Sequence, residues 1–362
     1  MKTTFLGSTG LRVSEFALGA MTFGTELGWG ADEDESRRMF NAYVDAGGNF
    51  IDTANAYTGG TSEKMVGKFV AGQRDRFVIA TKYTISQDRS DPNGGGNQRK
   101  SLMRALDDSL SRLGTDYIDL YYTHMYDGFT PIEETITALG DAVRAGKVLY
   151  VGLSDFPAWL VARADLYAEV RGLTRPACIQ IEYNLAQREA ERELIPMAES
   201  LGLSVLDWSP LGGGALSGKI VRPDPEENYQ GRVATSAVAR NFDKYKSDQT
   251  NTLVATLIEC ADQMGTTPAR LALAWLRAKG DMHIPIIGAR SHKHIVDNLQ
   301  AVSLEVPAEV MATLEAASAP SLGFPNHFLR GGQSDWFGDQ PQQLDPRARP
   351  VGRRFLGMDD RV

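Results

Sequence analysis

Four residues whose side chains handle protons or charge follow three consecutive apolar stretches of the sequence. Asp52 and Tyr57 lie in NFIDTANAYTGG (49–60), Lys82 lies in RFVIATKY (76–83), and His124 lies in DYIDLYYTHM (116–125). A phenol with a pKa of about 10 is a weak acid at neutral pH, and a neighbouring ammonium lowers that pKa. Together the four predict general acid catalysis by Tyr57, with Asp52 holding Lys82 and His124 donating a second hydrogen bond to a substrate carbonyl oxygen.

Each of the four residues also has an ordinary structural explanation. An Asp after a strand commonly forms a turn, a loop Tyr commonly packs, and a Lys or His at a strand end is commonly solvated or hydrogen-bonded. The apolar neighbours of Lys82 and His124 favour burial instead. Because a buried cation needs a partner such as Asp52, we interpret the four residues as one site.

None of these residues can supply a hydride, so reduction of a carbonyl group requires a redox cofactor. The segment DWSPLGGGALSGK (207–219) offers an aromatic plane at Trp208 and glycines that let a ligand approach the backbone. IIGARS (286–291) precedes a predicted helix start, a natural anion site where Arg290 could grip a phosphate. Gly213 to Lys219 matches the start of a P-loop, but Ile220 replaces the magnesium-binding Ser or Thr. A G-x-G-x-x-G dinucleotide fingerprint after a first strand is also absent from the sequence.

A regular alternation of strand-like and helical segments must position these residues. The predicted strands are 15–24, 49–54, 76–83, 116–125, 148–155, 177–184, 203–210 and 282–289. Helical periodicity follows at 35–47, 62–72, 98–114, 131–146, 157–172, 189–202, 251–265, 267–280 and 291–302. Strands that alternate with helices form parallel sheets, and eight such units in roughly 250–300 residues predict a (β/α)8 TIM barrel. The active site of that fold lies at the carboxyl ends of the strands, where the four residues fall.

Composition and boundaries narrow the class of protein further. Residues 1–12 predict an N-terminal β-hairpin, residues 1–317 a single domain, and residues 318–362 an irregular C-terminal tail that could cover the substrate pocket. The net charge of −8 argues against binding to nucleic acid. Because no apolar run reaches membrane-spanning length and no secretory signal is recognisable, we expect a cytoplasmic protein with no membrane partner. Cys178 and Cys260 form no disulfide or metal motif, and Cys178 is predicted to be buried.

The chain resembles the aldo-keto reductase superfamily. The resemblance extends from about residue 5 to residue 302 and depends on the motifs DTANAY, ATKY, YYTH, GLSD, QIEYN, WSPLGGG and IIGARS, in this order. It is closest in character to the long bacterial members, which are also similar to potassium-channel β subunits. The resemblance implies a (β/α)8 barrel that reversibly reduces aldehydes or ketones with NADPH rather than NADH. Tyr57 would protonate the carbonyl oxygen, Lys82 and Asp52 would tune it, and His124 would orient the substrate.

The resemblance also implies which residues bind NADPH or NADP+. They are Met21, Asp52, Ser154, Asp155, Gln180, Trp208, Ser209, Leu211, Gly213, Lys219, Gly288, Arg290, His294, Asp297 and Asn298, with Arg232 as a weaker candidate. Ser154 and Gln180 would bond the nicotinamide carboxamide and Trp208 would stack on the ring, while residues 209–219 line the pyrophosphate and residues 288–298 hold the adenosine. Three positions depart from the family pattern: Asp155 replaces an Asn, His294 a Gln and Asp297 a Glu. The preference for NADPH is inferred from the cationic Arg290 and Lys293 and from the lack of an acid beside Gly288 in the sequence.

The predicted substrate pocket is largely aromatic. Its residues are Trp29, Tyr57, His124, Met125, Tyr126 and Trp208, and Trp336 and Phe337 of the tail could fold over it. Such walls favour a small carbonyl or alcohol substrate: an apolar aldehyde, an aryl ketone or a cyclic secondary alcohol. Two other classes stay open: a nicotinamide-binding regulatory or partner subunit with little turnover, and a barrel hydrolase that uses Asp52 and Glu182. The hydrolase interpretation leaves Tyr57 and Lys82 without a role.

Overall fold

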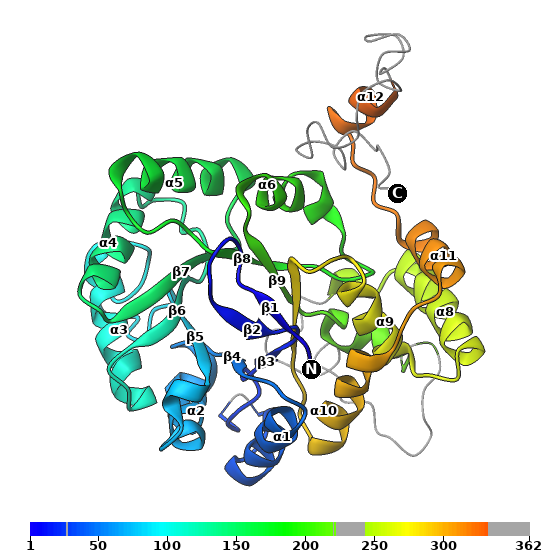
Figure 1. Cartoon of the computed structure of the whole chain (residues 1–362), viewed down its shortest axis with the longest axis horizontal. Coiled ribbons are helices and arrows are strands. Elements are labelled where there is room, and N and C mark those ends of the chain that lie inside the picture. Colours follow the sequence, from blue (N-terminus) through cyan, green and yellow to red (C-terminus); the bar gives the residue numbers. More distant parts are fainter. Residues whose placement is uncertain (27, 220, 222–242, 332–362) are drawn as a thin grey trace.

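Eight parallel strands close into a barrel in the computed structural model of the chain, which describes residues 1–26, 28–219, 221 and 243–331 (Figure 1). The strands are β3 (Ala17–Gly19), β4 (Phe50–Asp52), β5 (Val78–Tyr83), β6 (Ile118–Thr123), β7 (Val148–Ser154), β8 (Cys178–Glu182), β9 (Ser204–Trp208) and β10 (His283–Ile287). They neighbour one another in chain order, and β10 pairs with both β9 and β3 to close the ring. The predicted (β/α)8 barrel is therefore confirmed, and every predicted strand contains the observed one.

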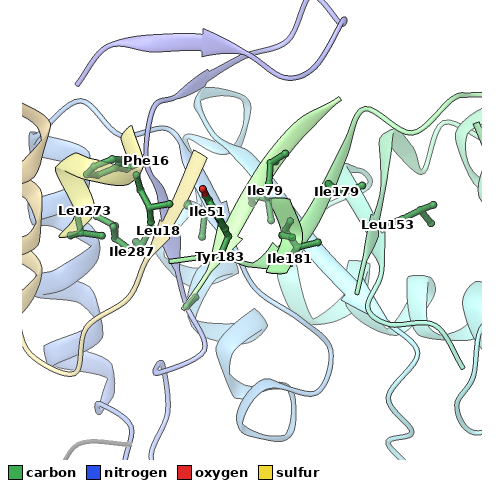
Figure 2. Close-up of a cluster of buried hydrophobic side chains, with 14 of the residues drawn as sticks. Phe16, Leu18, Ile51, Ile79, Leu153, Ile179, Ile181, Tyr183, Leu273 and Ile287 are labelled. Atoms are coloured by element: carbon green, nitrogen blue, oxygen red, sulfur yellow. The ribbon is translucent and has the colours of Figure 1, made fainter. Parts of the chain in front are cut away.

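The two-residue periodicity of the strands decides which side chains point into the barrel. Along β5, Val78 and Ala80 belong to the cluster inside the barrel, whereas Ile79 belongs to the layer between barrel and helices. The same alternation turns Lys82 inward. Figure 2 shows part of the outer layer, including Ile51 of β4 and Ile79 of β5. The inward positions at the carboxyl ends of the strands are Asp52, Lys82, His124, Ser154, Gln180 and Trp208, so one layer of the barrel holds six predicted site residues.

Helices surround the barrel (Figure 1). They are α1 (Glu33–Asp45), α2 (Thr61–Val70), α3 (Arg99–Leu113), α4 (Ile132–Arg144), α5 (Ala158–Arg171), α6 (Leu194–Leu201), α8 (Asp248–Gln263), α9 (Pro268–Arg277), α10 (His292–Leu299) and α11 (Ala308–Ser318). Helix α12 (Asn326–Gly331) lies outside this ring in Figure 1. Short 3-10 turns are η1 (Tyr57–Gly60), η2 (Arg74–Arg76), η3 (Glu189–Arg192), η4 (Gly212–Ser217) and η6 (Gln300–Ser303). Ser291 caps α10, as predicted, by accepting a hydrogen bond from the backbone N–H of His294.

The predicted hairpin closes the amino-terminal end of the barrel. Its strands β1 (Thr3–Phe5) and β2 (Arg12–Ser14) pair antiparallel and lie across the ring in Figure 1. Leu6 and Val13 are fully buried within the cluster inside the barrel. The backbone N–H of Gly7 donates a 2.7 Å hydrogen bond to the hydroxyl of Ser204, the first residue of β9.

The sequence analysis missed helices α11 and α12, and it predicted η3 and α6 as one helix. No element was predicted for α11, of which only Val310 and Leu314 are buried, so its apolar stripe is too short to stand out. The predicted helix 189–202 is divided into η3 and α6. The predicted irregular tail contains α12, and its remainder, with Trp336 and Phe337, lies outside the described residues. Cys178 is buried, as predicted. In the described part of the chain, no helix combines the length and apolarity that crossing a membrane requires.

Candidate active site

The ammonium of Lys82 is the centre of a buried cluster at the carboxyl ends of β4 and β5. Its Nζ donates to Asp52 Oδ1 at 2.5 Å, to the carbonyl oxygen of Thr53 at 2.8 Å, and to the hydroxyl of Tyr57 at 3.2 Å. These acceptors account for all three protons of the ammonium. The second carboxylate oxygen of Asp52 accepts a 2.8 Å bond from the amide of Gln180, so both oxygens of Asp52 are occupied. Asp52, Lys82 and Gln180 are all buried.

The electrostatics of this cluster keep Lys82 charged. Burial alone lowers the pKa of Lys82, but Asp52 and Tyr57 more than compensate, so its net pKa lies above the ordinary value. For Tyr57 the sequence predicted a lowered pKa, and this prediction was wrong in its net direction. Burial raises the pKa of Tyr57 and outweighs the nearby Lys82, which lowers it. Tyr57 is therefore a protonated acid at neutral pH, beside a cation that can stabilise its phenolate.

His124 lies against Tyr57 as a neutral imidazole. The two ring centroids are 5.8 Å apart, with the rings almost perpendicular at 77°. Burial, together with the charge of Lys82, lowers the pKa of His124 to about 3. Its Nδ1 is buried and has no hydrogen-bond partner among the residues that the structure describes. A neutral imidazole offers one N–H donor and one lone pair, so His124 can hydrogen-bond a ligand beside Tyr57.

An aromatic floor supports the cluster from within the barrel. The hydroxyl of Tyr122 lies 3.2 Å from Cys178 Sγ, and Lys82 Nζ lies 5.9 Å from the centroid of the Tyr122 ring. Gly152 leaves the room for this ring, because a Cβ there would come within 2.4 Å of Tyr122 and 3.0 Å of Cys178 Sγ. The Tyr122 ring thus lies below the ammonium of Lys82 inside the barrel, a neighbour that the sequence analysis did not identify.

Backbone strain collects at the same end of the barrel. Among the described non-glycine residues, positive φ angles occur at Thr58 (47°), Thr84 (101°), Asp155 (52°) and Ser209 (50°). Each of these is a predicted site residue or lies within two residues of one. Such conformations cost about 1–3 kcal/mol each and cluster at functional sites. Since the sequence gives no sign of them, they support the location of the site independently.

The predicted nicotinamide-binding residues occupy neighbouring strand ends. Ser154 and Gln180 are buried and lie opposite each other in the register of β7 and β8. The indole Nε1 of Trp208 donates a 3.0 Å hydrogen bond to Asp155 Oδ1. Asp155 therefore has a protein partner, in place of the amide contact expected of an Asn at this position.

The predicted pyrophosphate loop is a tight glycine turn. Ser209 and Leu211 precede η4, and within η4 Gly213 and Gly214 adopt φ angles of 65° and 105°, which favour glycine. The carbonyl oxygen of Ser209 accepts a 2.9 Å bond from the amide of Asn184. Lys219 is half-buried at the end of this segment, and Arg232 lies outside the described residues.

The start of α10 differs in charge from the prediction. Arg290 is half-buried and forms no ion pair with another described residue. An acid does lie nearby, however, because Glu35 of α1 accepts a 2.6 Å bond from the backbone N–H of His292. The sequence analysis considered only the chain neighbours of Gly288 and missed this carboxylate from a distant helix.

The remaining adenosine-binding candidates are partly committed to the protein. Asn298 is buried and its amide lies 3.5 Å from the carbonyl oxygen of Gly288. His294 Nδ1 lies 3.0 Å from the hydroxyl of Ser291. Asp297 accepts a 2.9 Å bond from Arg270 Nε and pairs with the same guanidinium through Nη2. Asp297 therefore binds Arg270 of α9, a partner that the sequence analysis did not identify.

The predicted substrate-pocket residues lie on loops around Tyr57. Trp29 is buried within the loop that the Phe23–Ala31 bridge closes, and Phe23 accepts a 2.7 Å bond from Thr58, next to Tyr57. Met125 is 37% exposed, and Tyr126 packs on Phe156 with ring centroids 5.5 Å apart. Met21 lies next to Thr22, whose hydroxyl bonds the carbonyl oxygen of Ala289 in the turn after β10.

Comparison with known proteins agrees with this geometry. The model of the aldo/keto reductase family matches residues 15–319. A norsolorinic acid reductase of Emericella nidulans is 37% identical over 330 residues, 88% of this chain and 82% of that protein. An NADP(+) aryl-alcohol dehydrogenase of Phanerodontia chrysosporium is 35% identical over 346 residues, 90% of this chain and 88% of that protein. A probable aryl-alcohol dehydrogenase of Saccharomyces cerevisiae is 34% identical over 307 residues, 82% of this chain and 92% of that protein. These matches support oxidoreductase chemistry, and the chain belongs to the aldo/keto reductase family.

Proposed function

We propose that the protein is an NADPH-dependent oxidoreductase that reversibly reduces aldehydes or ketones to alcohols, with Tyr57 as the general acid and base. The observation that carries this proposal is the buried ammonium of Lys82, which bonds both Asp52 and the hydroxyl of Tyr57. A bound nicotinamide would supply the hydride. The protein's own task is then to deliver a proton to the carbonyl oxygen as negative charge develops on it.

Tyr57 is suited to that proton transfer in both directions. Its raised pKa keeps the phenol protonated at neutral pH, ready to donate to the carbonyl oxygen. Lys82, 3.2 Å from the phenol oxygen, stabilises the phenolate that forms. Asp52 keeps the ammonium charged, and neutral His124 offers a further hydrogen bond for the substrate oxygen. During alcohol oxidation the same phenolate would take the proton back.

The cofactor residues proposed above follow the strand ends around the barrel. Ser154 and Gln180 would bind the carboxamide, Trp208 would stack on the ring, and the turn at Gly213 would admit the pyrophosphate. Arg290 is a guanidinium without an ion-pair partner in the described ranges, so it fits an additional phosphate, and we infer a preference for NADPH over NADH. The NADP(+) named for the Phanerodontia chrysosporium relative agrees with this inference.

We infer that the substrate is an apolar aryl or cyclic carbonyl compound or its alcohol. Trp29, Met125, Tyr126 and Trp208 would form the walls of its pocket. The names of the relatives, aryl-alcohol dehydrogenase and norsolorinic acid reductase, point to the same class of substrate.

One assay tests the proposed function. Purified protein is mixed with NADPH or NADH, cofactor binding is followed by nicotinamide fluorescence, and turnover is followed with aryl aldehydes, aliphatic aldehydes, ketones and aryl alcohols. We expect binding and turnover with NADPH, and the highest kcat/KM for aryl carbonyls. Binding without turnover of any compound would favour the regulatory subunit, and absence of both would contradict the proposal.

A further inference from the structure

Asp155 is bound to an aromatic side chain across the mouth of the barrel. Its Oδ1 accepts the 3.0 Å bond from the indole Nε1 of Trp208. Asp155 directly follows β7, Trp208 ends β9, and β8 separates the two strands in the barrel. The bond therefore spans one intervening strand, and the indole is held by a group from a different part of the chain.

The backbone fixes the carboxylate at this place. Asp155 adopts a φ of 52°, a left-handed conformation that Asp and Asn tolerate better than other non-glycine residues. Its N–H donates to the carbonyl oxygen of Gln180 at 3.0 Å, and its own carbonyl oxygen accepts from the N–H of Tyr126 at 3.4 Å. Both bonds attach the backbone of Asp155 to neighbouring strand ends, and the bond from Trp208 then orients its carboxylate.

Four charged or titratable groups act on this carboxylate or respond to it. They are Lys82 of β5, Glu182 of β8, Lys244, and Tyr57. Although solvent reaches the residue, partial burial raises the pKa of Asp155 to about 6. The negative charge of Glu182 raises this pKa further. The hydrogen bond from Trp208 and the positive charges of Lys82 and Lys244 lower it. Asp155 is thus ionised at neutral pH and becomes protonated in mild acid. In turn, its charge raises the pKa of Tyr57.

We propose that Asp155 is a positioning residue that holds the indole of Trp208 beside the reaction centre. A second part of this role concerns Tyr57, because the carboxylate of Asp155 places a negative charge at the same end of the barrel. Its Oδ1 binds the indole of Trp208, whereas the family resemblance implies that an Asn here would bind the nicotinamide carboxamide. The part that concerns Tyr57 rests on the proposed function, whereas the part that concerns Trp208 does not.

Tryptophan fluorescence of the protein without cofactor tests the first part. The chain has five Trp residues, so the emission of Trp208 is obtained by subtracting the spectrum of Trp208→Phe. Asp155→Asn retains an oxygen acceptor but cannot ionise, and Asp155→Ala removes both properties. We expect the Trp208 emission to titrate with a midpoint near pH 6 in the parent protein, to be independent of pH in Asp155→Asn, and to differ from both in Asp155→Ala. A flat titration in the parent, or an unchanged spectrum in Asp155→Ala, would overturn this part.

The pH profile of carbonyl reduction tests the second part. The rate of reduction should fall at high pH as Tyr57 loses its proton, and this part of the profile is the limb governed by Tyr57. Removing the charge in Asp155→Asn should move that limb to lower pH by roughly half a unit, a shift typical of one nearby charge. A merely structural role would lower the rate without moving that limb, and coincident limbs would overturn this part. If the parent protein reduces no carbonyl compound, the proposed function and this part fail together, while the fluorescence titration still decides the role of Asp155 toward Trp208.

Discussion

At the scale of single residues, two opposite effects act on the pKa of the Tyr57 phenol. Its buried surroundings favour the neutral phenol, and Lys82 favours the phenolate. A group poised between these effects can give and receive a proton without leaving its place. In the proposed mechanism Lys82 and Asp52 act through Tyr57, so the chemistry of the cluster would depend on one hydroxyl oxygen.

The Tyr57→Phe substitution removes that oxygen and leaves the aromatic ring. We expect NADPH affinity to stay within about twofold and kcat for carbonyl reduction to fall by roughly 10²–10⁴-fold, the usual contribution of general acid catalysis. Fluorescence quenching measures the affinity, and the decrease of nicotinamide absorbance measures the rate. Near-normal turnover in this variant would exclude Tyr57 as the proton donor.

The Lys82→Met substitution tests the electrostatic role of the ammonium. Because Lys82 lowers the pKa of Tyr57, its removal should raise that pKa further. Alcohol oxidation requires the phenolate, so its pH profile should move toward higher pH, and oxidation at neutral pH should be lost more completely than reduction. The two directions are measured in parallel between pH 6 and 10, and an unshifted oxidation profile would contradict the role assigned to Lys82.

At the scale of elements, the start of α10 combines a cation from the turn before it with an acid from helix α1. Arg290 has no ion-pair partner in the described ranges, whereas Glu35 of α1 bonds the N–H of His292. A bound phosphate near this helix end would be attracted by the first and repelled by the second. If the cofactor's additional phosphate binds here, as proposed, the balance between the two charges would contribute to the preference for NADPH.

Two substitutions at this helix end should change NADPH affinity in opposite directions. Arg290→Ala should weaken NADPH by roughly 10–100-fold and NADH much less, as expected for a lost charge-assisted hydrogen bond. Glu35→Gln should strengthen NADPH by roughly twofold to fivefold, since an opposing charge is removed. Dissociation constants for both cofactors measure the effect. Glu33→Gln is the matched control, because Glu33 lies on the same helix and pairs with Lys68 instead. Equal losses of NADPH and NADH affinity in Arg290→Ala would show that Arg290 does not bind the additional phosphate.

At the scale of the whole molecule, a buried arginine attaches helix α11 to the loop that follows β8. Arg188 is 5% exposed, and its Nε and Nη2 bond the two carboxylate oxygens of Glu191 at 2.7 and 3.0 Å. The same guanidinium bonds Glu315 at 2.5 Å and Ser318 at 2.6 Å, both on α11. Helix α11 in turn packs on α8.

Arg188→Met should therefore destabilise the protein by about 2–3 kcal/mol at neutral pH, because it removes charge-assisted hydrogen bonds from two half-buried carboxylates. The loss is limited because Glu191 keeps its bond from Tyr183 and Glu315 keeps those from Trp275 and Lys279. Burial raises the pKa of Glu191, but Arg188 outweighs it, so the net pKa of Glu191 in the folded protein is lowered. Its contribution to stability is then present above the unfolded pKa of about 4.3 and is lost as the pH falls through the lower folded pKa. The difference in Tm between parent and variant should narrow in that acidic range. Arg163→Met, which breaks an exposed pair with Glu133, is the control and should cost no more than about 1 kcal/mol. A constant difference in Tm from pH 7 to pH 3 would contradict this account.

The sequence predicted the barrel because its signals are local. Alternating strands and helices, the hairpin and the Ser291 cap each depend on short segments, and the motif residues fall at strand ends in any such barrel. The contact between Glu35 and α10 and the pair of Asp297 with Arg270 join helices distant in sequence, so no local pattern reveals them. The net pKa of Tyr57 depends on how much water the folded chain removes, which spacing alone does not show. The family model ends at residue 319, next to the predicted boundary at 317, and we still propose a single domain before the tail.

The left-handed residues around the mouth have a consequence for engineering. Selection for heat resistance alone would favour glycine at Ser209, since glycine relieves the unfavourable φ at that position. Thr84 differs, because its hydroxyl bonds Asn97 and the backbone N–H of His124. The folded state of a Ser209→Gly variant would be more stable, but the turn after β9 that positions Trp208 would be more flexible. Thermal stability would then increase at the expense of the catalytic rate. Stabilising substitutions are therefore better made at the opposite end of the barrel, which the hairpin covers.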